Sequence, residues 1–154
     1  QMMDFTDVDV APLVAGIAKT TALQLEQKGM KAVVDLPERL IIHGNQSLLY
    51  SIFRNLTDNA IAYAGEGTTI QLSAHDEGSQ WRFVFSDNGV GIEPQHLSRI
   101  FERFYRVDKG RSRKMGGTGL GLAIVKNAVG LHGGSITATC PAEGGMRFEF
   151  TLNK

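Results

Sequence analysis

The segment Asp87-Asn88-Gly89-Val90-Gly91 constrains this chain most strongly. It follows residues 81–86, in which side chains alternate as they do in a β-strand. A carboxylate at the end of a strand can accept a hydrogen bond from the exocyclic amine of a flat ligand. Gly89 and Gly91 have no Cβ, so the backbone can turn sharply and approach a ligand closely. A plain turn explains the same residues equally well, so the interpretation depends on the rest of the chain.

Composition limits the class of protein. The 154 residues, 42% of them apolar, suit one domain with a real core. Sixteen basic residues balance sixteen acidic ones, which argues against nucleic acid as a partner. Cys140 is the only cysteine, so no disulfide can form within the chain, as suits a reducing compartment. No apolar run is long enough to span a membrane, and no secretory signal is visible.

Periodicity predicts the order of helices and strands. Residues 1–9 are expected to form a linker or a short edge strand. Pro12 suits a first helical turn, Asn45 is a candidate N-cap, and glycines 29, 65 and 67 are natural helix stops. The predicted helices are 10–28, 46–64 and a third from about 122 to 131; the predicted strands are 31–36, 39–43, 68–75, 80–86, 135–140 and 147–152.

Two asparagines lie one turn apart in the second predicted helix. Asn55 and Asn59 share a face near the edge of its apolar stripe. Amide oxygens are hard ligands, and Mg²⁺ is held by a few such oxygens together with phosphates and water. The alternative is simply a polar edge on an amphipathic helix.

A glycine-rich segment precedes the third helix. Residues 117–121 would leave N–H groups free at a helix start, where the helix dipole also favours a phosphate. Close packing of the helix is the alternative. The spacing matches neither a Walker loop nor the dinucleotide-binding fingerprint. The basic segment 106–116 just before it is interpreted as a mobile loop.

Taken together and in this order, the motifs resemble the catalytic, ATP-binding domain of bacterial sensor histidine kinases, of the Bergerat (GHKL) fold. The likeness covers nearly the whole chain and is greatest to the phosphate-regulon and cell-wall sensor branch. The matching segments are Asn55-Leu56-Thr57-Asp58-Asn59-Ala60 (N box), Asp87-Asn88-Gly89-Val90-Gly91 (first glycine box), Phe101-Glu102-Arg103-Phe104 (phenylalanine box) and Gly117-Thr118-Gly119-Leu120-Gly121-Leu122 (second glycine box).

The resemblance implies an α/β (α+β) two-layer sandwich. Its sheet would be mixed, mainly antiparallel and of about five strands, with three main helices on one face. Residues 1–154 would be one catalytic domain, with residues 1–9 leading from a dimerisation hairpin outside the sequence. The implied cofactors are ATP and Mg²⁺.

The resemblance also implies a role for individual residues. Asp87 would bind the adenine amine, Asn59 supported by Asn55 would ligate Mg²⁺, and Arg103 or Arg106 would meet the γ-phosphate. Phe101 and Phe104 would anchor the start of an ATP lid, residues 106–116, in apolar surface. The remaining nucleotide-binding residues would be Tyr63, Gly89, Gly91, Ile92, Phe104, Lys114, Gly117, Thr118, Gly119, Leu120, Gly121 and Leu122.

The implied reaction is transfer of the γ-phosphoryl group of ATP to a histidine on the hairpin, for relay to a response regulator. None of His43, His75, His96 and His132 has the setting of that histidine. Because the chain begins with Gln1, we expect it to be a fragment of a longer protein. The resemblance implies that the parent is an inner-membrane sensor that dimerises through the hairpin, and that this domain is cytoplasmic and itself monomeric.

Two other functions remain open. Related ATPases carry a glutamate where this chain has Asn55, which disfavours hydrolysis by an activated water. The family often has a basic residue where this chain has Ala62, which leaves room for a non-catalytic module that only senses nucleotide. In a catalytic domain, the missing phosphate contact would instead be supplied from the lid by Lys109, Arg111, Arg113 or Lys114.

Overall fold

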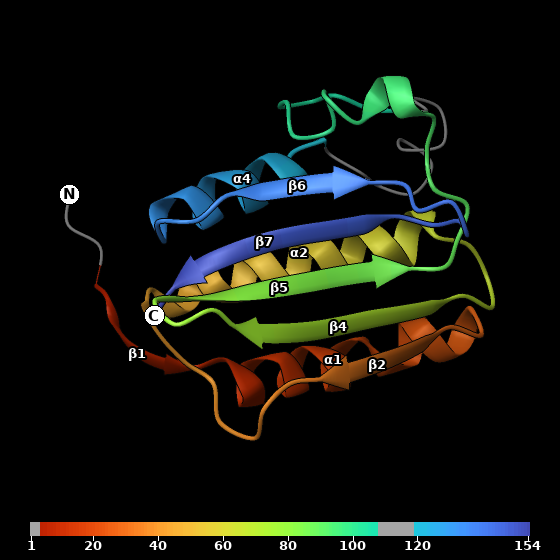
Figure 1. Cartoon of the computed structure of the whole chain (residues 1–154). Coiled ribbons are helices and arrows are strands. Elements are labelled where there is room, and N and C mark those ends of the chain that lie inside the picture. The colour runs from red at the N-terminus through yellow and green to blue at the C-terminus, as the bar shows by residue number, and fades with distance from the viewer. Residues whose placement is uncertain (1–3, 108–118) are drawn as a thin grey trace.

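The computed structural model describes residues 4–107 and 119–154, which form a sheet with helices packed on one face (Figure 1). This arrangement confirms the predicted two-layer α/β fold. The helices are α1 (Val10–Gln27), α2 (Gln46–Tyr63), the short 3₁₀ helix η1 (Pro94–His96) and α4 (Gly121–Leu131); the strands are β1 (Thr6–Asp9), β2 (Lys31–Asp35), β3 (Ile41–Gly44), β4 (Thr69–Asp76), β5 (Gln80–Asp87), β6 (Ile136–Thr139) and β7 (Arg147–Asn153).

The main sheet has five strands in the order β2-β4-β5-β7-β6. β2 runs parallel to β4, and every other neighbouring pair is antiparallel. The predicted mixed, mainly antiparallel sheet is therefore confirmed. β5 lies at its centre, which explains why the strand leading to Asp87 is rich in β-branched and aromatic residues.

The core lies between this sheet and the three helices. Phe83 of β5 sits opposite Phe150 of β7, and their rings stack with centroids 5.1 Å apart. Phe53 of α2 meets both rings, at 5.4 and 5.8 Å. All three side chains are almost fully buried. Burial of these aromatic surfaces fixes the rotation of α2 about its axis, and hence the side of α2 on which its asparagines lie.

Both long helices begin at a side-chain cap. Asp9 Oδ1 accepts hydrogen bonds from the backbone N–H groups of Ala11 and Leu40, at 3.2 and 3.1 Å. Asn45 Oδ1 accepts from Leu48 N at 3.0 Å, which confirms the predicted N-cap. Gly29, at φ +63°, lies just beyond α1, as its position in the sequence predicts.

The N-terminal segment forms a strand over residues 6–9. β1 pairs antiparallel with β3 in a separate two-stranded sheet, with Val8 opposite Ile42. Both valine and isoleucine are buried. Of the two alternatives for this segment, residues 6–9 therefore adopt the edge strand.

No helix in the described parts of the chain combines the length and apolarity needed to cross a membrane.

Candidate functional site: the residues around Asp87

Asp87 ends β5 with its carboxylate held in one orientation. Oδ1 accepts hydrogen bonds from Gly89 N at 2.9 Å and from Met146 N at 3.3 Å. Oδ2 makes no hydrogen bond to any described residue. Partial burial raises the pKa of Asp87, and the two backbone N–H groups offset part of that rise. One carboxylate oxygen is thus fixed by the protein, while the other can accept a donor from a ligand.

The loop after Asp87 packs against the end of α2. A Cβ on Gly89 would lie 2.1 Å from the carbonyl oxygen of Ala64, so only glycine fits there. The next residue, Val90, donates its N–H to the same Ala64 oxygen at 3.1 Å. The first glycine box is therefore fixed to the helix that carries the N box.

The turn before β7 closes on the other side of this loop. Gly145 has φ +85°, and a Cβ there would lie 1.9 Å from the Asp87 carbonyl oxygen. Gly91, at φ +67°, approaches the carbonyl oxygen of Gly145 in turn. Sequence reasoning did not identify residues 144–146 as part of the site. The pair Gly144-Gly145 directly before a strand was the available signal.

The N box meets the start of α4. Asn55 Nδ2 donates to Ser51 O at 2.8 Å, which leaves its Oδ1 directed elsewhere. A Cβ on Gly121 would lie 3.2 Å from that Oδ1. The second glycine box and the N box are thus neighbours, as the phosphate hypothesis requires. Asn59 follows Asn55 by one turn and is half-buried.

The donor chemistry of this region suits Mg²⁺ held largely by phosphate and water. Asn55 and Asn59 would offer amide oxygens, a hard ligand type that Mg²⁺ accepts. Within residues 4–107 and 119–154, no three His, Cys, Asp or Glu side chains gather as a metal cluster.

The phenylalanine box joins the second glycine box through the backbone. Phe104 N donates to Gly119 O at 2.7 Å. Gly119 has φ +77°, and a Cβ there would be 2.7 Å from Phe104 Cα and 3.4 Å from Arg106 Nε. Arg106 therefore lies at the second glycine box. Arg103 is exposed, and no hydrogen bond or ion pair to a described residue holds it.

The expectation that Phe104 anchors in apolar surface is wrong. Its side chain is 67% exposed, and its φ is +65°, a left-handed conformation that costs a non-glycine residue about 1–2 kcal/mol. The backbone bond to Gly119 turns the chain here and directs the ring outward. Phe101 provides the anchor, with an edge-to-face contact to Phe148 at 6.2 Å.

The other predicted site residues divide into two groups. Tyr63, Ile92, Leu120 and Leu122 are all half-buried; Ile92 O accepts from Cys140 Sγ at 3.3 Å, and Leu122 packs against the core. Lys114, Gly117 and Thr118, and the cations suggested as substitutes, Lys109, Arg111 and Arg113, lie outside the described residues.

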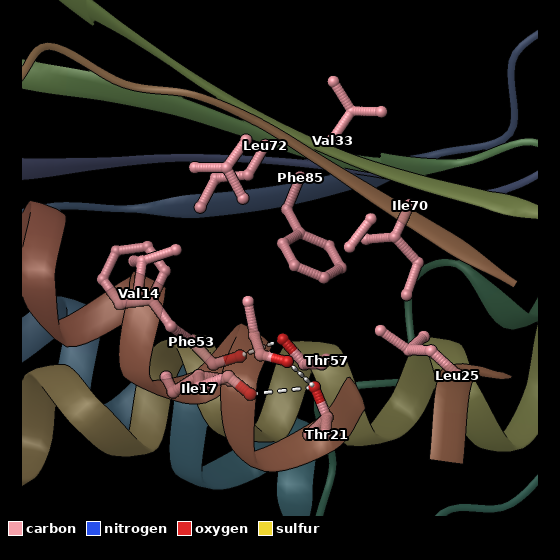
Figure 2. Close-up of a pocket in the computed structure, with 13 residues that line it drawn as sticks. Val14, Ile17, Thr21, Leu25, Val33, Phe53, Thr57, Ile70, Leu72 and Phe85 are labelled. Atoms are coloured by element: carbon pink, nitrogen blue, oxygen red, sulfur yellow. Dashed lines mark hydrogen bonds between the residues drawn. The ribbon is translucent and has the colours of Figure 1, made fainter. Parts of the chain in front are cut away.

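A small hollow lies between α1 and the sheet, away from the candidate site (Figure 2). Its volume is about 30 Å³, which is room for only about two water molecules. Figure 2 shows Ile70, Leu72 and Phe85 of the sheet directed toward it, opposite Phe53 of α2 and residues of α1. The hydroxyls of Thr21 and Thr57 donate to carbonyls of their own helices. This hollow is too small and too apolar to hold a nucleotide.

Comparison with known proteins gives the family. The sequence profile described as "Histidine kinase-, DNA gyrase B-, and HSP90-like ATPase" matches residues 44–154. The chain belongs to this family of ATPase domains. The profile begins just before α2 and includes all four boxes, so the family assignment rests on the part of the chain that builds the candidate site.

Relatives of this ATPase-family domain are sensor kinases. "Sensor-like histidine kinase SenX3" of Mycobacterium bovis is 36% identical over 152 residues, which are 99% of this chain and 37% of the relative. "Signal transduction histidine-protein kinase BaeS" of Escherichia coli is 34% identical over 94% of this chain and 31% of the relative. The chain thus spans only about a third of the length of these relatives.

Solved structures support the same fold. The "Mycobacterial sensor histidine kinase MprB" superimposes with a TM-score of 0.82 at 26% identity, over 97% of each chain. The catalytic domain of histidine kinase ThkA, at 23% identity, has a TM-score of 0.84 over 99% of this chain and 98% of its own. The resemblance predicted from the four boxes is confirmed.

The two glycines of α4, Gly121 at its first position and Gly130 near its end, provide a matched test of the site. Gly121→Ala places a Cβ against Asn55 Oδ1, so we expect weaker binding of Mg-ATP in a calorimetric titration. Gly130→Ala on the same helix meets nothing within 4 Å, so it should leave binding unchanged and stabilise the fold by up to about 1 kcal/mol. Equal affinity in both variants would contradict the proximity of the N box to the phosphates.

Asp87 also predicts a pH dependence of stability. Because its pKa is raised in the folded state, Asp87 favours folding below its ordinary pKa, and that contribution is lost as the pH rises through the raised value. Asp87→Asn does not ionise, so its stability relative to the parent chain should increase from pH 4 to pH 7 in urea denaturation.

Asp76→Asn is a control, because the pKa of Asp76 is shifted in the opposite direction from that of Asp87. Asp76 is exposed, and its hydrogen bond to Lys154, with a second from Gly78 N, lowers its pKa. Its contribution is present above the ordinary pKa and lost as the pH falls through the lowered one. Asp76→Asn should therefore lose stability relative to the parent chain as the pH rises through the lowered pKa to its ordinary value of 3.8, and the difference should change little from pH 4 to pH 7. Parallel trends for the two variants would contradict the burial of Asp87.

Proposed function

We propose that this chain binds Mg-ATP and, as part of a longer sensor kinase, transfers the γ-phosphoryl group to a histidine on a helical hairpin outside this sequence. The observation that carries the proposal is the Asp87 carboxylate, whose Oδ1 is fixed by two backbone N–H groups while Oδ2 is left for a ligand. The family membership supports ATP as that ligand.

In this proposal Asp87 Oδ2 accepts a hydrogen bond from the adenine amine, and the close backbone at Gly89 and Gly91 admits the flat ring. Tyr63 and Ile92 line the ring. The N–H groups at the start of α4 face the phosphates, where the helix dipole favours negative charge. Arg106, beside Gly119, is better placed than the exposed Arg103 to meet the γ-phosphate.

Mg²⁺, held by the oxygens of Asn55 and Asn59, would supply positive charge to the phosphates during transfer. In phosphoryl transfer of this kind the protein mainly positions groups and balances charge. Asn55 can position these groups, but its amide cannot act as a general base to activate water as a glutamate carboxylate could. Its presence therefore favours transfer over hydrolysis.

The partners follow from the relatives. These are named as sensor or signal-transduction histidine kinases, and one ThkA structure is described as a complex with response regulator protein TrrA. We propose that this chain likewise works within a membrane-anchored homodimer, on the cytoplasmic side, and that a response regulator receives the phosphoryl group.

If Asp87 accepts a hydrogen bond from adenine, replacing its carboxylate should weaken the binding of Mg-ATP. Asp87→Asn presents an amide N–H₂ to the adenine amine, so affinity for Mg-ATP should fall by about 1–3 kcal/mol, the usual cost of an unmatched buried polar group. Isothermal calorimetry measures this. Asp76→Asn, at the far end of the β4–β5 hairpin, should bind as the parent chain does. An unchanged affinity for Asp87→Asn would place adenine elsewhere.

The transfer half is tested with γ-labelled ATP. The chain alone should stay unlabelled, because none of its histidines is the acceptor. Addition of a purified hairpin from the same parent protein should produce labelled, acid-labile phosphohistidine on the hairpin. Label on the chain itself, or release of phosphate with no labelled hairpin, would refute transfer and favour a self-modifying enzyme or an ATPase.

A further inference from the structure

His132 is a buried group that nucleotide binding does not use. It follows the last residue of α4, and its side chain is only 3% exposed. Nδ1 lies 2.7 Å from Ala128 O, and Nε2 accepts from Asn45 N at 3.1 Å. Since Asn45 N–H can only donate, Nε2 must accept, and the proton of the neutral ring lies on Nδ1.

The ring of His132 ties α4 to the start of α2. Asn45 is the N-cap of α2, and its backbone N–H donates a hydrogen bond to Nε2 of this ring. A Cβ on the preceding Gly44 would lie 2.6 Å from the ring, so the imidazole fits directly against the backbone. The end of α4 cannot move along α2 without breaking this contact.

The N-terminal segment, here Asp4 and Phe5 just before β1, contacts the same ring. Phe5 stacks on His132 with centroids 5.1 Å apart and an interplanar angle of 22°. Asn45 Nδ2 also donates to Asp4 O at 3.2 Å. In Figure 1 this segment and the end of α4 lie on the same side of the molecule, opposite the start of α4. The segment before β1 therefore contacts both helices through one junction.

The same two helices meet again at the candidate site. There Gly121, the first residue of α4, lies against Asn55 of α2. With 11 residues, α4 is about 16 Å long, so the His132 and Gly121 contacts with α2 lie at its two ends. If α4 moves as one unit, a shift at its His132 end changes the spacing between Gly121 and the N box at the other end.

We propose that His132 is a positioning residue, which sets the spacing of α2 and α4 at the nucleotide site according to how the N-terminal segment docks on it through Phe5. The proposal rests on the proposed function in taking nucleotide affinity as one readout. It gives a route by which the position of the preceding part of a longer protein would alter ATP binding.

The test removes the stacked ring and leaves His132 in place. Packed contact chains of this kind carry coupling of about 0.5–2 kcal/mol, so Phe5→Ala should weaken Mg-ATP binding about 2- to 30-fold. It should also shift the Gly121 amide resonance in the nucleotide-free chain. Phe5→Tyr keeps the ring and should restore both. Leu23→Ala, which truncates a 65% exposed side chain on α1, should change neither.

A double-mutant cycle separates coupling from a merely structural role. If Phe5 acts through His132, Phe5→Ala should have no further effect on affinity or on the Gly121 resonance in a His132→Gln background. Additive effects, or an unchanged affinity and resonance in Phe5→Ala, would overturn the proposal. Failure of the parent chain to bind Mg-ATP would refute the proposed function instead, and the Gly121 resonance would still decide the coupling.

Discussion

Three backbone segments meet at Asp87 at distances that exclude any Cβ. The loop at Gly89 touches the end of α2, and Gly145 touches the carbonyl of Asp87 itself. Because these contacts involve main chain, little can relax, and the carboxylate is held by N–H groups from two of the three segments. The candidate site depends on this rigid junction, since a binding group acts best when its geometry is set before the ligand arrives.

Helix α2 connects this junction with the other parts of the molecule. Its terminal Ala64 receives the Asp87 loop, its Asn55 meets the start of α4, and its cap at Asn45 binds His132. Its buried face is fixed by Phe53 against the aromatic pair of the sheet. One helix thus transmits the packing of the core to the adenine acceptor, to the proposed metal ligands and to the N-terminal segment.

Local features of the fold were predictable from the sequence because local physics decides them. Alternation identified β5, Asn45 was recognisable as a cap, and Gly29 as a stop. The association of the Asp87 loop with the N box required the resemblance, since the two motifs are separate in the chain. The structure brings the Asp87 loop and Gly121 to the same helix, α2.

Features made by distant contacts were not predictable. The backbone N–H of Met146 donates to the Asp87 carboxylate across 59 positions of sequence. The identity of a methionine side chain gives no indication of where its backbone N–H donates. Phe104 reads as an apolar anchor, yet its backbone bond to Gly119 directs the ring to solvent. His132 resembles any surface histidine near a glycine pair until Asn45 and Phe5 are found on its ring. In each case tertiary contacts override what the local sequence favours.

The most direct measurement is a crystal structure of this chain with Mg²⁺ and a non-hydrolysable ATP analogue. The account predicts the adenine amine within hydrogen-bond distance of Asp87 Oδ2, with the metal between the phosphates and Asn59. Adenine bound away from Asp87, or phosphates directed away from both Asn55 and Gly121, would contradict it.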